Sequence, residues 1–274
     1  MSLNLIYDIG ICIYALSLLF YISDCVSRNR AAKRIGTGLL VVVALFQAVA
    51  VLQRVIETGM LPVFTSFDFL LLCSLSVTIT SVAITFVKRA EFAALLLSVV
   101  GFGVTVLNRL LLTTGYNPLD AWDTVKGLLV FHIALASVSL TALTVGAVFA
   151  GMYLFLHSKL KHKKWNDVIR RLPSLEILDK YSYNALLIGT PVLVLSLGLA
   201  IFSVATEGRW TLLADLKVLS TSVALGIYIN YFVRRRIQRR SGLETARWAL
   251  IGLAFIVLNF FLNAWSEFHS WSGV

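Results

Sequence analysis

Eight long apolar runs decide what this chain can fold into. Each runs for about 20 residues or more, which is the length that an α-helix needs to cross the hydrocarbon of a bilayer. Hydrophobic residues make up 58% of the 274 residues and charged residues only 14%, and a soluble domain of this size could not bury so much apolar surface. The sequence therefore predicts an all-α integral membrane protein, a bundle of eight transmembrane helices. We expect a single polytopic membrane domain over residues 1–274, with spans at about 3–23, 36–56, 66–87, 91–112, 127–156, 181–206, 214–233 and 246–267.

The basic residues gather between alternate apolar runs. Of the 24 Lys and Arg, 19 fall in the four stretches 28–34, 88–89, 159–180 and 234–247. Because membrane proteins retain Lys and Arg in their cytoplasmic loops, we expect these four connections inside and both termini outside the cytoplasm. Contact with anionic lipid headgroups accounts for the net charge of +10 without a nucleic-acid partner.

The longest hydrophilic segment lies between the fifth and sixth spans. In SKLKHKKWNDVIRRLPSLEILDK (158–180), a helical pattern of apolar residues ends at Pro173; its members are Trp165, Val168, Ile169 and Leu172. This pattern predicts a short amphipathic helix on the inner leaflet. The chain has no nucleotide-binding loop, metalloprotease helix or nucleophile elbow, so we predict no catalytic residue and no enzymatic activity.

Ionisable residues inside the apolar runs concentrate near the predicted outer ends. Such residues are costly in lipid and usually face the bundle interior or a water-filled cavity. Each lies within about two turns of an outer helix end; they are Arg54, Glu57, Asp68, Arg109, His132, Asp215, Lys217, Glu267 and His269. Four tryptophans lie at the same level: Trp122, Trp210, Trp265 and Trp271. The sequence therefore predicts a polar, aromatic site on the outside.

Two histidines at that level, His132 and His269, indicate a metal or haem site. Imidazoles from two helices can ligate a haem iron, and nearby cations can pair with the propionates. The available cations are Arg54, Arg109, Lys126, Arg209 and Lys217. A zinc site would need further ligands. The alternatives are a hydrogen bond from His132 to a neighbouring helix and a role for His269 at the membrane interface.

Four segments, in this order and on these helix ends, resemble the cytochrome c assembly family of haem-handling membrane proteins, the CcsA (ResC) type. They are LPVFTSFDFLLL (61–72), FHIALASVSLTALTVGAVFAGMYLFL (131–156), LDKYSYNALLIGTPVLVLSLG (178–198) and LNAWSEFHSW (262–271). The second and fourth are similar to the family's segments around two external haem-ligand histidines. The resemblance thus implies haem b as the cofactor, His132 and His269 as iron ligands and a bacterial plasma membrane as the location. The predicted site also includes Arg54 and Arg109, by their charge and level, and Trp210 of the external loop.

Two departures distinguish the chain from family members that attach haem. The tryptophan-rich external loop of those members is reduced to EGRWTLLADLKVL (207–219), and LGIYINYFVRRR (225–236) lacks the histidine that they carry on the next helix. The resemblance is therefore closest to members that regulate tetrapyrrole synthesis by lowering the level of glutamyl-tRNA reductase. It implies that enzyme or a membrane protease as a cytoplasmic partner. The alternatives are a haem delivery or lyase subunit of cytochrome c assembly and, last, a small-solute transporter.

The charge distribution makes a topological prediction. Reporter fusions after Arg30, Lys163 and Arg239 should report the cytoplasm, and fusions after Tyr116 and at the C-terminus should report the outside. A cytoplasmic C-terminus would require an odd number of crossings, and it would separate His269 from His132.

Overall fold

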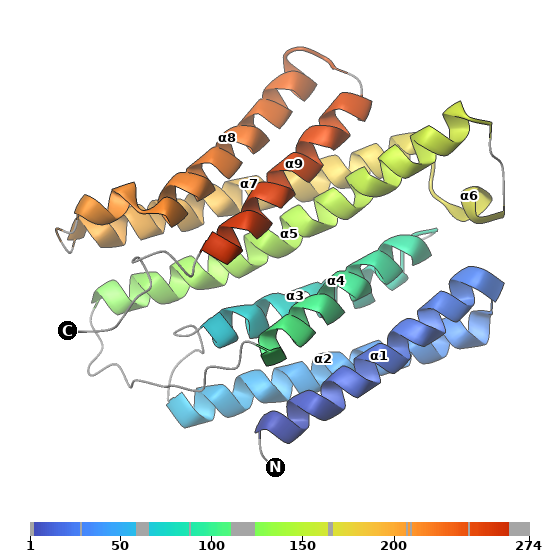
Figure 1. Ribbon diagram of the computed structural model, residues 1–274, viewed down its shortest axis with the longest axis horizontal. Helices are drawn as coiled ribbons and strands as arrows, with labels where there is room; N and C mark the ends of the chain where they lie inside the picture. The colour runs from blue at the N-terminus through green and yellow to red at the C-terminus, as the bar shows by residue number, and fades with distance from the viewer. Residues whose placement is uncertain are drawn as a thin grey trace. The chain divides into compact units, whose positions relative to one another are not determined.

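The computed structural model describes residues 3–27, 29–58, 66–87, 89–110, 124–163, 167–206, 208, 210–240 and 242–262. Eight helices in these ranges are long and apolar enough to cross a membrane. They are α1 (Leu3–Ser27), α2 (Arg30–Thr58), α3 (Ser66–Thr85), α4 (Glu91–Leu110), α5 (Thr124–Lys161), α7 (Leu175–Thr206), α8 (Leu216–Arg236) and α9 (Gly242–Leu262) (Figure 1). Two short elements join them, the helix α6 (Asp167–Arg171) and the 3₁₀ turn η1 (Trp210–Ala214). The predicted all-α membrane class with eight spanning helices is confirmed.

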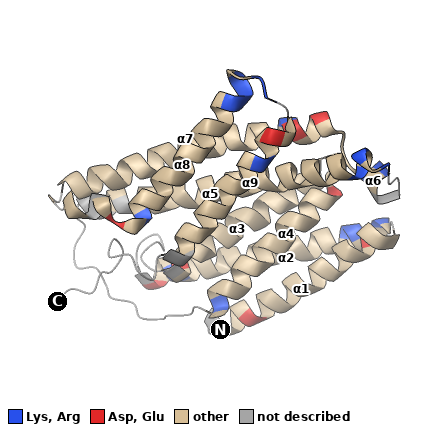
Figure 2. Ribbon diagram, turned by 45° about the horizontal axis from the view of Figure 1, so that its top comes forward, with Lys and Arg blue, Asp and Glu red and all other residues tan. Residues whose placement is uncertain are grey.

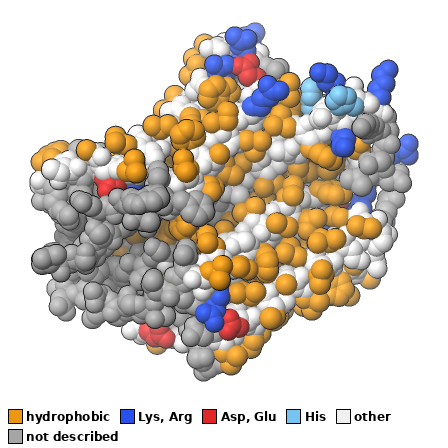
Figure 3. Space-filling model, in the orientation of Figure 1, with side chains coloured by type: hydrophobic (Ala, Val, Ile, Leu, Met, Phe, Trp, Pro, Cys, Tyr) orange, Lys and Arg blue, Asp and Glu red, His pale blue; other side chains and the backbone are white. Residues whose placement is uncertain are grey.

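The described side chains are distributed as a bilayer requires. Charged residues gather near the helix ends and are scarce along the stretches between (Figure 2). Hydrophobic side chains cover the helix sides on the face shown in Figure 3. Of the described residues, Leu19 and Ile188 expose more than half of their surface although each lies near the middle of its helix. Apolar side chains at such positions are stable when lipid tails cover them.

The helices form two compact units. The first comprises Met1–Ala121 and Trp165–Pro173, and the second Trp122–Lys164 and Ser174–Val274. In the first unit α1 packs against α2 and α4, and α3 packs against α2 and α4. In the second unit the principal pair is α5 and α7, while α9 packs against α5 and α8.

Three buried tyrosines lie along one face of α1 in the first unit. Tyr7, Tyr14 and Tyr21 are seven residues apart on α1, so they lie on one face of the helix, and all three are buried. The Tyr7 hydroxyl accepts a hydrogen bond from the Asn108 side chain at 2.6 Å. The other two tyrosines share hydrogen bonds with threonine hydroxyls of neighbouring helices. Such contacts hold helices together where lipid removes the hydrophobic drive for association.

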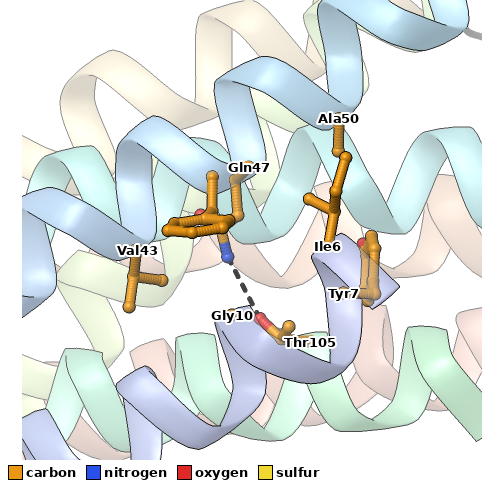
Figure 4. A pocket seen from close by; sticks show the side chains of 8 residues that line it. Ile6, Tyr7, Gly10, Val43, Gln47, Ala50 and Thr105 are labelled. Carbon is orange, nitrogen blue, oxygen red and sulfur yellow. Dashed lines mark hydrogen bonds between the residues drawn. The ribbon is translucent and has the colours of Figure 1, made fainter. Parts of the chain in front are cut away.

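A small pocket opens between α1, α2 and α4 of the first unit (Figure 4). Its lining is mostly apolar, with Gln47 and Thr105 as the polar exceptions nearest its middle. The Gln47 amide donates a hydrogen bond of 3.2 Å to the Thr105 hydroxyl, whereas its carbonyl oxygen is buried without a partner. A buried acceptor of this kind is normally satisfied by an ordered water.

The predicted amphipathic segment forms α6, which ends before Pro173. Ile169 and Leu172 of this segment are buried within the first unit, and a position on the inner leaflet stays a prediction. Arg171 ties the segment to α1, because its guanidinium donates hydrogen bonds to the carbonyls of Asp24 and Cys25 at 3.2 and 3.1 Å. Both carbonyls belong to the last turn of α1, where helix carbonyls commonly accept hydrogen bonds from outside the helix. Trp165 and the Val168 side chain lie outside the described residues.

Candidate functional site

His132 lies near the start of α5 and is hydrogen-bonded to Ser196 of α7. Its Nδ1 is 2.8 Å from the carbonyl oxygen of Ser196 and 3.0 Å from the hydroxyl of the same residue. In return, the Ser196 hydroxyl donates to the His132 carbonyl at 3.0 Å. The interhelical hydrogen bond that the sequence offered as an alternative role for His132 is therefore present.

This contact determines which imidazole nitrogen carries the hydrogen. A backbone carbonyl can only accept a hydrogen bond, so Nδ1 of His132 must be the donor. In the neutral ring Nε2 then has no hydrogen and presents a lone pair. Among the described residues no hydrogen bond to Nε2 is found. A histidine that donates from one nitrogen to a carbonyl while the other stays available has the arrangement of a metal ligand with its orienting partner.

The contact is the first of three that form a ladder between α5 and α7. Ser139 donates its hydroxyl to the Gly189 carbonyl, and Ser182 donates to the Gly146 carbonyl, both at 2.9 Å. We call these three pairs the α5–α7 ladder: His132–Ser196, Ser139–Gly189 and Gly146–Ser182. Successive members are seven residues apart on both helices, which keeps one face of each helix turned to the other.

The two glycines of the ladder allow the helices to approach closely. A Cβ atom added to Gly189 would lie 2.8 Å from the Leu143 side chain, and one added to Gly146 would lie 2.7 Å from that of Leu186. Both leucines are fully buried. Each leucine thus packs directly on the opposite backbone, and small residues at such positions are typical of tightly packed membrane helices.

A cation and an aromatic side chain belong to the same unit as His132. Lys217 lies in the first turn of α8, in the same unit as His132. Asp215 caps α8 by accepting a hydrogen bond of 2.8 Å from the Lys217 backbone nitrogen. Just before this cap, η1 packs against α7 and α8 and carries Trp210, which is 62% exposed.

Helix α9, which precedes the predicted ligand His269 in the sequence, is hydrogen-bonded to the first half of α8. Asn259 of α9 accepts a hydrogen bond from the Ser220 hydroxyl and donates one to the Thr221 hydroxyl, both at 2.7 Å. These contacts lie one turn from Lys217. His269 itself lies outside the described residues, as do Trp265, Glu267, Trp271, Trp122 and Arg209 and the side chain of Lys126.

Of the predicted site residues, Arg54 and Arg109 belong to the first unit, and His132 and Trp210 belong to the second. Arg54 pairs with Asp68 at 3.0 Å, and the Asp68 side chain is 1% exposed. Arg109 makes two hydrogen bonds, of 2.7 and 3.1 Å, to the carboxylate of Asp8. Asp68 is among the ionisable residues predicted at the outer level, whereas Asp8 is not, because nothing local to Asp8 or Arg109 indicates a partner 101 residues away.

The inner histidines are distant from His132. His157 lies on the same helix, 25 residues further along, which corresponds to roughly 37 Å of helix length. In the described part of the chain no group of three or more His, Cys, Asp or Glu side chains could hold a metal ion. One imidazole with a cation in the same unit suits a haem, whose porphyrin supplies four of the iron ligands, better than it suits a bare ion.

The long apolar helices of the described residues define a multi-pass membrane protein. The chain belongs to the cytochrome c assembly protein family, whose model matches residues 11–269. It is similar to protein HemX of Brevibacillus brevis, with 33% identity over 268 residues that cover 97% of each chain. It is also similar to protein HemX of Bacillus subtilis (strain 168), with 31% identity over 263 residues, or 96% of this chain and 95% of that one. The predicted family membership is confirmed.

The close approach of α5 and α7 can be tested at Gly189. Gly189→Ala should lower the free energy of unfolding by about 1–3 kcal/mol because its methyl group would overlap the Leu143 side chain. Thermal or denaturant unfolding in mixed micelles measures the change. Gly198→Ala on the same helix is the matched control, since no atom lies within 4 Å of the added Cβ, and its effect should stay within about 0.5 kcal/mol. Equal losses in the two variants would contradict the packing described for the ladder.

Proposed function

We propose that this protein binds haem b through His132 and His269 and regulates tetrapyrrole synthesis by lowering the level of glutamyl-tRNA reductase. The observation that carries the haem site is the His132 ring, whose Nδ1 is occupied by Ser196 while Nε2 has no hydrogen-bond partner among the described residues. Membership of the cytochrome c assembly family supports haem as the ligand.

The second unit supplies suitable surroundings for such a ligand. Haem, when bound, brings an iron that takes axial imidazoles and two propionates that need cations. Lys217, in the first turn of α8 of this unit, is the cation that we propose for one propionate. Trp210, in the η1 turn that packs against α7 and α8, offers an exposed indole. Arg54 and Arg109, which the sequence also offers for the propionates, belong to the first unit and pair there with Asp68 and Asp8.

The regulatory role rests on the similarity to the two HemX proteins over nearly the whole chain and on the reduced external loop at 207–219. In this proposal the protein performs no catalysis. It lowers the level of glutamyl-tRNA reductase by contacting either that enzyme or a membrane protease on the cytoplasmic side. The competing proposal, a haem delivery or lyase subunit, is favoured by the family name alone.

The haem site can be tested by visible spectroscopy of the purified protein. Because both axial ligands set the spin state, His132→Ala or His269→Ala should weaken haem binding or leave a five-coordinate, high-spin haem. The double variant should retain none in a pyridine haemochrome assay. His157→Ala and His162→Ala are the matched controls, and they should leave the spectrum unchanged. Unaltered haem content and spin state in the double variant would refute the assignment.

The regulatory role can be tested by deleting the gene. We expect glutamyl-tRNA reductase protein or total porphyrin to rise while c-type cytochromes remain, and immunoblots, porphyrin fluorescence and haem staining measure these quantities. Complementation with the His132→Ala variant then shows whether regulation needs the haem site. If c-type cytochromes disappear and porphyrin stays constant, the assembly role is correct and the regulatory one is wrong.

A further inference from the structure

We infer that Ser196 is a positioning residue, which holds the His132 ring in the one tautomer whose Nε2 can bind an iron. The inference deepens the proposed function and rests on it only for the identity of the ligand that Nε2 meets. The state of the ring itself is a property of the chain and exists without haem.

Ser196 offers the ring two acceptors and anchors its backbone at the same time. The Nδ1–H group lies within hydrogen-bond distance of both the carbonyl oxygen and the hydroxyl oxygen of Ser196, at 2.8 and 3.0 Å. The hydroxyl hydrogen is directed to the His132 carbonyl at 3.0 Å, so the hydroxyl oxygen keeps its lone pairs for Nδ1–H. The opposite tautomer would place two lone pairs against the Nδ1 lone pair, and Ser196 therefore selects the hydrogen on Nδ1.

Burial strengthens this selection. Ser196 is 1% exposed, so water does not compete for the two acceptors. In an environment of low dielectric an unpaired acceptor is costly and a paired one is correspondingly favourable. A surface serine in the same geometry would exchange the imidazole for water and leave both tautomers populated.

The other two pairs of the ladder have a separate role, which is to fix the register. A register shift of one residue along α5 would rotate the His132 ring by about 100° around the axis of that helix. Ser139 and Ser182 bind glycine carbonyls two and four turns from His132 and do not contact its ring. Their loss should weaken the helix pair without altering the tautomer. If Ser196 were purely structural, its substitution would leave the tautomer unchanged, as we expect for Ser139. Comparing the two substitutions therefore tests the inference.

The test is nitrogen NMR on the full chain in lipid nanodiscs without haem. His157→Gln, His162→Gln and His269→Gln leave His132 as the single ¹⁵N-labelled histidine, at a mildly alkaline pH that keeps the ring neutral. We expect a protonated Nδ1 and an unprotonated Nε2. Ser196→Ala should reduce the ratio of this tautomer to the other by about threefold, the effect of one interhelical hydrogen bond in a membrane protein. Ser139→Ala should leave the ratio unchanged, and Ser196→Thr, which keeps the hydroxyl, should restore it.

Two results would overturn the inference: a protonated Nε2 in the chain with Ser196 intact, or an equal change in the ratio for Ser139→Ala and Ser196→Ala. A second arm uses haem and the unsubstituted histidines. Haem should dissociate about threefold faster from Ser196→Ala than from Ser139→Ala. If the protein with Ser196 and all four histidines retains no haem, the proposed function fails, and the NMR arm still decides the role of Ser196.

Discussion

In lipid, polar groups must find partners within the protein, and helices gain little by hiding apolar side chains from apolar tails. The α5–α7 ladder meets both conditions at once. Each of its pairs satisfies a serine hydroxyl with a carbonyl of the facing helix, and its glycines let two buried leucines pack on backbone. The second unit is arranged around this pair, because α9 packs on α5 and α8 packs mainly on α9. The position of His132 follows from the ladder.

The same contact changes how the histidine is to be understood. From the sequence, a hydrogen bond to a neighbouring helix and a role as metal ligand were alternatives for His132. The sequence does not show which of the two ring nitrogens makes which contact. In the structure Nδ1 makes the hydrogen bond and Nε2 remains available, so the two roles are compatible. The first unit shows the opposite case. There Arg54 and Arg109 each have a carboxylate partner of their own, and their charge contributes first to holding that unit together.

Local features of the sequence predicted the helices well, since the length of an apolar run is visible without knowledge of its neighbours. They predicted partners poorly. The seven-residue spacing of Ser139 and Gly146, and of Ser182 and Gly189, is readable in the sequence as a small-residue pattern, but nothing in it says that α5 meets α7. The pairing of Asp8 with Arg109 and the burial of Ile169 of α6 depend on tertiary contacts in the same way. The environment of His269 lies outside the described residues.

The composition of the ladder also differs between its native register and the nearest periodic alternative. In the native register every pair contains one serine, so each level holds one serine hydroxyl that donates to a carbonyl of the facing helix. A slip of one heptad would preserve the helical faces but set Ser139 against Ser196 and Gly146 against Gly189. Leu143 and Leu186 would then lose the glycines on which they pack. The native register is therefore the one that spreads the hydroxyls evenly along the helix pair and gives both leucines their space.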